Sequence, residues 1–216
     1  MTKLTIDGQE IEVAEGMTVL EAARKADIYI PAVCAHPMLT PDGSCRLCLV
    51  EIEGIDELVT SCNSKVVEGM AIHTDTPRVR EERKEALKKL LAHHPCECLT
   101  CERRDRCQPY DICLRNVSVS QRCVLCPKNG QCELQQVIDY IGLEGEEATW
   151  QYRSLPVDRD NPLFERDYNL CISCARCVNV CKEFRGIEAI KMVDHDGQRW
   201  PEPCDGKSLA SSGCRY

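Results

Sequence analysis

The sequence predicts an α+β fold in which short strands and amphipathic helices alternate with cysteine-rich loops. The first thirty residues alternate like a β-hairpin and then continue into a capped helix. Residues 77–92 form a second helical pattern with one apolar stripe. The chain has 216 residues, of which only 5% are aromatic, so no large aromatic core is available. That length fits two to three small domains.

The hairpin and the first helix have specific local signals. Apolar and polar residues alternate on both sides of Asp7-Gly8, a turn signal that predicts two antiparallel strands. Thr18 is expected to cap the following helix, with Glu21 completing a capping box. Two further strands are expected, one at residues 49–52 and one around residues 70–73.

Two more elements are expected later in the chain. A short amphipathic helix is expected to end at Gly142, with an apolar face of Leu134, Val137, Ile138 and Ile141. A hairpin-like piece is expected at residues 187–193, followed by the turn signal Asp196-Gly197.

The pattern at residues 77–92 predicts an amphipathic helix. Pro77 suits the first turn of a helix, where its missing N–H costs nothing. The interleaved acidic and basic residues are typical of a solvated helix face rather than of a nucleic-acid patch. The predicted apolar stripe consists of Val79, Ala86, Leu87, Leu90 and Leu91.

Composition limits the location and the partners of the chain. No signal peptide and no apolar run of about 18 residues is visible. We therefore expect a cytoplasmic protein with no membrane span, whose 18 cysteines are reduced and free to bind metal. The net charge of −8 argues against nucleic acid as a partner.

The first cysteine set has the spacing C-x10-C-x2-C-x13-C and consists of Cys34, Cys45, Cys48 and Cys62. Four thiolates on the loops of a small sheet suit a [2Fe–2S] cluster, in which each iron takes two ligands. The alternative is a structural zinc site. Zinc ribbons usually show two C-x2-C knuckles, whereas this set has one.

A C-x2-C-x5-C pattern occurs twice in the middle of the chain, and each copy predicts a [4Fe–4S] site. The first site is His94, Cys98, Cys101 and Cys107, and the second is Cys113, Cys123, Cys126 and Cys132. A neutral imidazole ligand should raise the reduction potential of the cluster that it binds. The alternative role for His94, an interaction with a helix C-terminus, fits His93 better. Cys96 is left over, either as a spare thiol or as a competitor for one of the two sites.

A third pattern, C-x2-C-x2-C-x3-C, begins at Cys171 and is specific for a [4Fe–4S] cluster. Its first three ligands are Cys171, Cys174 and Cys177. The fourth is either Cys181 or Cys214, because in two-cluster ferredoxins the last cysteine of such a run serves the other cluster. The roles of Cys204 and Cys214 stay open. The full prediction is one [2Fe–2S] and two to four [4Fe–4S] clusters, with three favoured.

Taken together, these motifs resemble the N-terminal iron–sulfur arm of the complex I 75 kDa or G subunit family, which also occurs in [FeFe]-hydrogenases and NAD-linked formate dehydrogenases. The resemblance rests on residues 43–48, 93–107 and 167–181, in that order. It implies three units: a β-grasp [2Fe–2S] domain (1–76), a small helical domain around the histidine-ligated cluster and the extra four-cysteine site (77–148), and a ferredoxin-like segment (149–216) that is either complete or truncated.

One stretch departs from the family. The family has a single C-x2-C-x5-C followed by Glu-Leu-Gln, and here that tail follows Cys132 rather than Cys107. Residues 107–123 therefore resemble an insertion that adds a cluster. His94 could then partner the second triplet, Cys123, Cys126 and Cys132. We keep it with the first triplet, because only three residues separate it from Cys98.

The predicted function is electron relay. The chain shows neither G-x-G-x-x-G nor G-x4-G-K-[ST], so no nucleotide or flavin site is visible. The resemblance implies a non-catalytic subunit between a flavin-containing NAD(P)H dehydrogenase-type subunit and a catalytic redox subunit, such as a hydrogenase, a formate dehydrogenase or another reductase. The alternatives are a zinc-binding scaffold and the N-terminal fragment of a larger redox enzyme.

Overall fold

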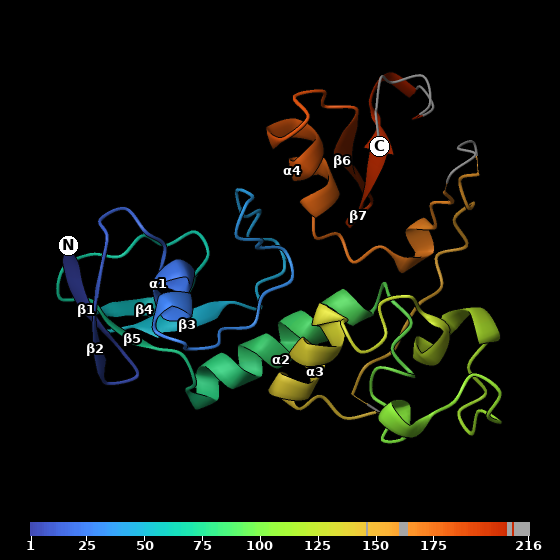
Figure 1. Ribbon diagram of the computed structural model, residues 1–216, viewed down its shortest axis with the longest axis horizontal. Helices are drawn as coiled ribbons and strands as arrows, with labels where there is room; N and C mark the ends of the chain where they lie inside the picture. The colour runs from blue at the N-terminus through green and yellow to red at the C-terminus, as the bar shows by residue number, and fades with distance from the viewer. Residues whose placement is uncertain (146, 160–163, 207–208, 210–216) are drawn as a thin grey trace.

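The computed structural model describes residues 1–145, 147–159, 164–206 and 209. A five-stranded sheet, two packed helices and a small lobe of one helix and a two-stranded hairpin follow one another along the chain (Figure 1). This confirms a mixed α/β structure. The elements are β1 (Thr2–Ile6), β2 (Gln9–Val13), α1 (Val19–Lys25), β3 (Leu49–Ile52), β4 (Ile55–Thr60), β5 (Ala71–His73), α2 (Pro77–Leu91), α3 (Glu133–Ile141), α4 (Arg176–Glu183), β6 (Ile190–His195) and β7 (Gln198–Pro203).

The five-stranded sheet has the order β2-β1-β5-β3-β4. Strand β1 runs parallel to β5 and antiparallel to β2, and β3 runs antiparallel to both β4 and β5. Asp7 and Gly8 join β1 and β2 with φ values of 49° and 81°, as a tight hairpin turn requires. The predicted hairpin is confirmed. Strand β4 was not predicted, because its first three residues are exposed and their pattern does not alternate.

Helix α1 covers one face of this sheet. Its capping box is confirmed: the Glu21 amide donates to Thr18 Oγ1 (3.2 Å), and the Thr18 amide donates to Glu21 Oε2 (2.7 Å). The buried side chains Val19 and Ala22 share a core with Ile6, Val50 and Ile72 of the sheet. This packing holds the loop that follows α1, residues 26–48, against the end of the sheet.

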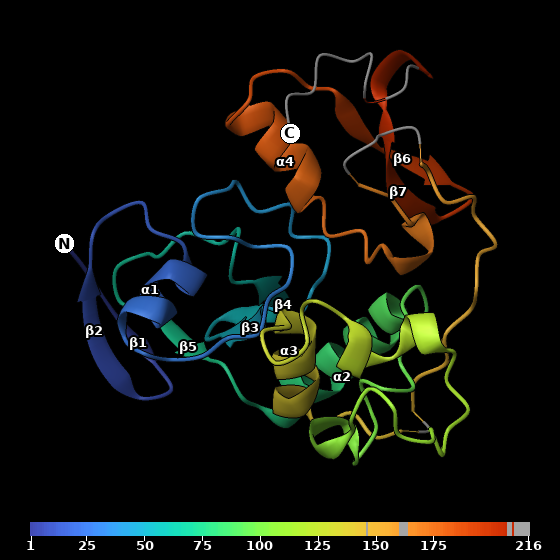
Figure 2. The ribbon, with the colours of Figure 1, turned by 45° about the vertical axis from the view of Figure 1, so that its right-hand side comes forward.

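Helices α2 and α3 pack against each other beside the sheet (Figure 2). Pro77 is the first residue of α2, as expected, and Thr76 caps the helix. The predicted stripe of α2 is buried apart from the half-buried Ala86, and Arg83 is buried with it, which the pattern did not indicate. Helix α3 ends at Gly142, whose φ of 70° makes a left-handed cap.

The last lobe contains α4 and the hairpin of β6 and β7. The sequence predicted the hairpin but not α4, because the cysteine spacing gave no amphipathic pattern. Helix α4 begins after Ala175, whose φ of 57° turns the chain sharply out of the cysteine loop. None of the described helices is long and apolar enough to cross a membrane.

Candidate metal centres

The first cysteine set lies at one end of the five-stranded sheet, and all four of its thiols are buried. Cys34 and Cys45 come from the long loop after α1, and their Sγ atoms are 3.2 Å apart. Cys48 immediately precedes β3, and Cys62 follows β4. The antiparallel pairing of β3 and β4 therefore places Cys48 and Cys62 side by side.

Neighbouring thiols control the charge of this set. Hydrogen bonds from Cys45 and Cys62 lower the pKa of Cys34 to about 2, and the same contacts raise the pKa values of Cys45 and Cys62. A hydrogen bond from Cys62 likewise lowers the pKa of Cys48 to about 7. The four thiols form two buried pairs, Cys34 with Cys45 and Cys48 with Cys62, and one thiol of each pair has a lowered pKa. This arrangement fits a two-iron cluster in which each iron takes two thiolates.

Gly43 lies in the loop just before Cys45 and has a left-handed backbone conformation. Its φ is 72°, and a Cβ atom at this position would collide with the side-chain amide of Asn63. The positive φ therefore favours glycine at this point of the loop, whereas the Asn63 side chain could move aside. Among the described residues, no three His, Cys, Asp or Glu side chains are arranged to hold a single metal ion.

His94 follows α2 and is held with its ring in a defined tautomer. Its Nδ1 lies 2.9 Å from the carbonyl oxygen of Pro95, which can only accept a hydrogen bond, so Nδ1 carries the proton. Burial lowers the pKa of His94, so the ring is neutral near pH 7. Nε2 then presents a lone pair, as metal-ligating histidines do when a backbone carbonyl holds the other nitrogen.

Members of both mid-chain sets meet at one small apolar cavity of about 50 Å³. Its cysteines are Cys98, Cys101, Cys107, Cys113 and Cys123. Cys98 and Cys123 are in contact, since a hydrogen bond between their thiols lowers the pKa of Cys98 to about 6 and raises that of Cys123. The sequence pattern assigns these two residues to different sets. Cys126 is exposed, and Cys132 is the N-cap of α3.

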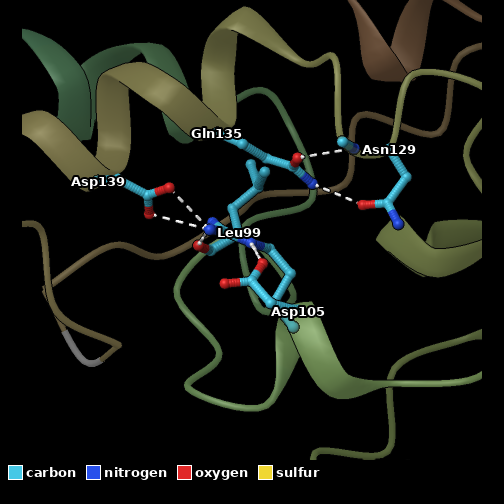
Figure 3. A network of polar contacts seen from close by, with 7 residues as sticks. Leu99, Asp105, Asn129, Gln135 and Asp139 are labelled. Carbon is cyan, nitrogen blue, oxygen red and sulfur yellow. Dashed lines mark hydrogen bonds and ion pairs between the residues drawn. The ribbon is translucent and has the colours of Figure 1, made fainter.

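Two polar contacts tie the cysteine-rich loops to α3 (Figure 3). Arg104 donates to the Leu99 carbonyl (2.9 Å) and to both carboxylate oxygens of Asp139 (2.8 and 3.0 Å). Gln135 donates to the Asn129 side chain (3.0 Å) and contacts the Cys123 thiol. Sequence reasoning missed both contacts, although Gln135 belongs to the Glu-Leu-Gln tail that follows Cys132.

Cys96, to which the sequence pattern gives no role, packs into the core between α2 and α3. Its side chain is 2% exposed, and its Sγ lies 3.6 Å from the Ala148 carbonyl oxygen. Burial raises the pKa of Cys96 to about 11, so this thiol stays protonated. It behaves as a small apolar side chain.

The third run lies on the loop before α4 and on α4 itself. Burial raises the pKa values of Cys174 and Cys177, and the charges of Cys171 and Cys174 add to the effect at Cys177, so these three thiols are neighbours. Cys181 lies further along α4, where its Sγ accepts from the Ala189 amide (3.1 Å) in a separate small core. Cys204 follows β7, and Cys214 lies outside the described residues.

The candidate sets face one shared hydrophobic core. That core contains cysteines of the first set and the second triplet together with one from the third run: Cys34, Cys45, Cys123, Cys132 and Cys174. The charge of Cys34 also contributes to the raised pKa of Cys174. Arg176 lies between them and donates to the carbonyl of Ala35, the residue after Cys34 (3.0 Å).

Comparison with known proteins supports a 2Fe-2S domain at the start of the chain. Residues 1–77 match the family model of a 2Fe-2S iron-sulfur cluster binding domain. The G subunit of NADH-quinone oxidoreductase from Rickettsia bellii is 35% identical over 198 residues, which are 92% of this chain and 25% of that protein. The chain is homologous to the G subunit of NADH-quinone oxidoreductase.

Other proteins that are similar to this chain are redox proteins as well. The NADPH-Fe(3+) oxidoreductase subunit alpha of Geobacter sulfurreducens is 31% identical over 214 residues, 99% of this chain and 22% of that protein. A crystal structure of NAD+-reducing [NiFe]-hydrogenase in the H2-reduced state matches with a TM-score of 0.76 and 25% identity, covering 99% of this chain and 80% of the hydrogenase chain. This chain thus spans about a quarter or less of the length of the two curated relatives.

Proposed function

We propose that this chain is an iron–sulfur electron-relay module of a multi-subunit NAD(P)-linked oxidoreductase. The single observation that carries the proposal is the burial of four free thiols, Cys34, Cys45, Cys48 and Cys62, in a domain of the 2Fe-2S family. Homology to subunits of NADH-quinone oxidoreductase and of NAD+-reducing hydrogenase supports the electron-transfer role. A set of this kind binds a cluster that accepts and releases one electron at a time.

Three [4Fe–4S] sites are proposed in addition to the two-iron site. Two involve the mid-chain sets, His94 with Cys98, Cys101 and Cys107, and Cys113 with Cys123, Cys126 and Cys132. Because Cys98 contacts Cys123, the structure is also compatible with ligand sets that exchange these two cysteines. The neutral, oriented ring of His94 supports a ligand role.

The third four-iron site involves Cys171, Cys174 and Cys177, with Cys181 or Cys214 as the fourth ligand. The common core that reaches Cys34, Cys123 and Cys174 supports a relay, because electron transfer through protein slows steeply with distance. The protein between the sites then determines the distance between the clusters, their burial and the hydrogen bonds that adjust the reduction potential of each cluster.

We assign three domains to this module. Residues 1–76 form the β-grasp [2Fe–2S] domain, which the sheet order β2-β1-β5-β3-β4 with α1 across it supports. Residues 77–148 form the domain of the mid-chain sets, and residues 149–216 form the ferredoxin-like segment. The many free thiols favour a reducing compartment, the cytoplasm.

The proposed partners are a flavin-containing NAD(P)H dehydrogenase-type subunit, which supplies electrons, and a catalytic redox subunit, which consumes them. The identities of the relatives, an NADH-quinone oxidoreductase, an NADPH-Fe(3+) oxidoreductase and an NAD+-reducing hydrogenase, support this kind of assembly. Within it the chain carries electrons and performs no catalysis of its own.

Anaerobic purification followed by iron, sulfide and zinc analysis tests the proposal. We expect a brown protein with iron and acid-labile sulfide in equal amounts, and an electron paramagnetic resonance (EPR) signal of a reduced two-iron cluster. The matched variant Cys48→Ser should lose that signal, whereas Cys96→Ser should retain it. A colourless protein with stoichiometric zinc would instead establish a structural scaffold.

A further inference from the structure

Arg83 of α2 is a charged residue on the buried face of an amphipathic helix, where apolar side chains are expected. Its side chain is among the largest that are fully buried, with a relative exposure of 2%. It points into the contact between α2 and β3 rather than to solvent. Burying an ionised group without a compensating charge is costly, so a guanidinium here requires an anion nearby.

No carboxylate forms an ion pair with Arg83 among the residues that the structure describes. Asp75, whose charge does act on Arg83, is already engaged by Arg80 through two hydrogen bonds of 2.7 and 2.5 Å. Burial lowers the pKa of Arg83, and its interaction with Tyr140, which includes a side-chain hydrogen bond, and the charges of Cys48 and Asp75 oppose that effect. The buried Nε atom of Arg83 has no hydrogen-bond partner.

The backbone contact that Arg83 makes leads to the first cysteine set. Its Nη2 donates to the Leu49 carbonyl oxygen at 2.7 Å, and Leu49 directly follows Cys48. Cys48 and Leu49 are 0% and 1% exposed, so no water screens the guanidinium from this thiol. Arg83 therefore supplies a fixed positive charge, oriented by the backbone, behind one ligand of the proposed two-iron cluster.

We propose that Arg83 is a positioning residue that raises the reduction potential of the two-iron site by balancing the negative charge which reduction adds there. Reduction converts one ferric ion to ferrous, with one electron entering and no proton required. A cluster with four thiolates becomes more negative in that step, and a nearby buried cation stabilises the reduced form more than the oxidised form. This inference rests on the proposed function, since it requires the two-iron cluster.

The test is an EPR-monitored redox titration, with dithionite as reductant, of the full chain purified with its clusters. Arg83→Gln removes the charge but keeps a donor for the Leu49 carbonyl, and Arg83→Met removes both. Both should lower the equilibrium constant for reduction of the two-iron signal at least tenfold, which is about 59 mV for one electron. Arg83→Lys keeps the charge and should stay near the parent midpoint. Arg80→Gln, on the exposed face of the same helix, is the matched control and should change nothing.

The outcomes separate this inference from the proposed function. A parent protein without the two-iron signal contradicts the proposed function itself. A parent with the signal, and Arg83→Gln at the parent midpoint, overturns the role of Arg83 alone. If the neutral variants lose the cluster while Arg83→Lys keeps it, the charge requirement is supported. If all three variants lose it, the residue is architectural and the inference fails.

Discussion

Arg176 and Glu133 form a two-point ion pair that joins the last lobe to the helical pair. The two guanidinium nitrogens of Arg176 lie 2.9 and 2.7 Å from the two carboxylate oxygens of Glu133, the first residue of α3. Because Arg176 also donates to the Ala35 carbonyl, a single side chain connects α4, α3 and the loop of the first cysteine set. This lowers the pKa of Glu133, mainly through the hydrogen bond from Arg176.

Arg176→Ala should loosen the last lobe without unfolding the sheet. The pair is partly exposed, so we expect a local loss of about 1–3 kcal/mol, in the range of hydrogen bonds to charged groups. Hydrogen exchange should speed up over residues 176–183 and 33–36. Lys182 lies on the same helix as Arg176, and Lys182→Ala, which removes a longer contact to Glu188 in the following loop, should have little effect. Equal exchange in both variants would contradict the connecting role.

His94→Cys should keep a cluster but lower its midpoint potential. A thiolate adds negative charge where the neutral imidazole had none, so reduction becomes less favourable, by about 59 mV or more if the equilibrium constant falls tenfold. A redox titration of the four-iron EPR signals measures the shift. His93→Gln, one residue away, is the control. If every midpoint is unchanged in His94→Cys, then His94 is not a ligand.

Cys98→Ser and Cys123→Ser test whether ligands exchange between the two proposed mid-chain sites. Because the two thiols are in contact in the structure, an exchange predicts that both variants alter the same EPR signal. The ligand sets derived from spacing predict two different signals instead. Oxygen ligation weakens binding of the soft iron–sulfur core, so each variant should reduce or shift one signal. The comparison variant is Cys126→Ser, whose thiol is exposed and outside the cavity. Separate effects of Cys98→Ser and Cys123→Ser would support the spacing-derived sets.

Cys96→Ala should leave the iron content unchanged and lower the stability modestly. The buried Sγ of Cys96 faces a backbone carbonyl rather than the cavity of the mid-chain cysteines, so its loss removes packing but no ligand. We expect about 1 kcal/mol, which corresponds to a few degrees in the thermal loss of visible absorbance. Any drop in iron per protein would make Cys96 a ligand after all.

Asp139→Ala should increase hydrogen exchange in the loop of residues 99–107. The Arg104 side chain is only 9% exposed and would lose its contact with α3, at a cost of about 1 kcal/mol. Asp105→Ala is the control, because Asp105 also pairs with Arg104 but is 83% exposed and lies within the loop itself. A larger effect from Asp105→Ala would show that α3 does not hold the loop.

Local patterns in the sequence predicted most of the regular structure. The Asp7-Gly8 hairpin, the capping box of Thr18 and Glu21, Pro77 at the start of α2 and Gly142 at the end of α3 depend on neighbouring residues alone. Such signals act within one turn of the backbone, so the chain order suffices to find them. The cysteine spacing likewise identified the candidate ligands, since close thiol pairs require short loops.

Long-range packing produced the features that spacing does not contain. Strand β4 exists because β3 offers an edge to pair with, and the contact of Cys98 with Cys123 joins residues 25 positions apart through a folded loop. The core role of Cys96 and the burial of Arg83 depend on what α3 and β3 place against α2. In both cases, neighbours distant in sequence determine the chemistry of the side chain. Apolar neighbours keep the Cys96 thiol protonated, and the Leu49 carbonyl holds the Arg83 guanidinium near Cys48.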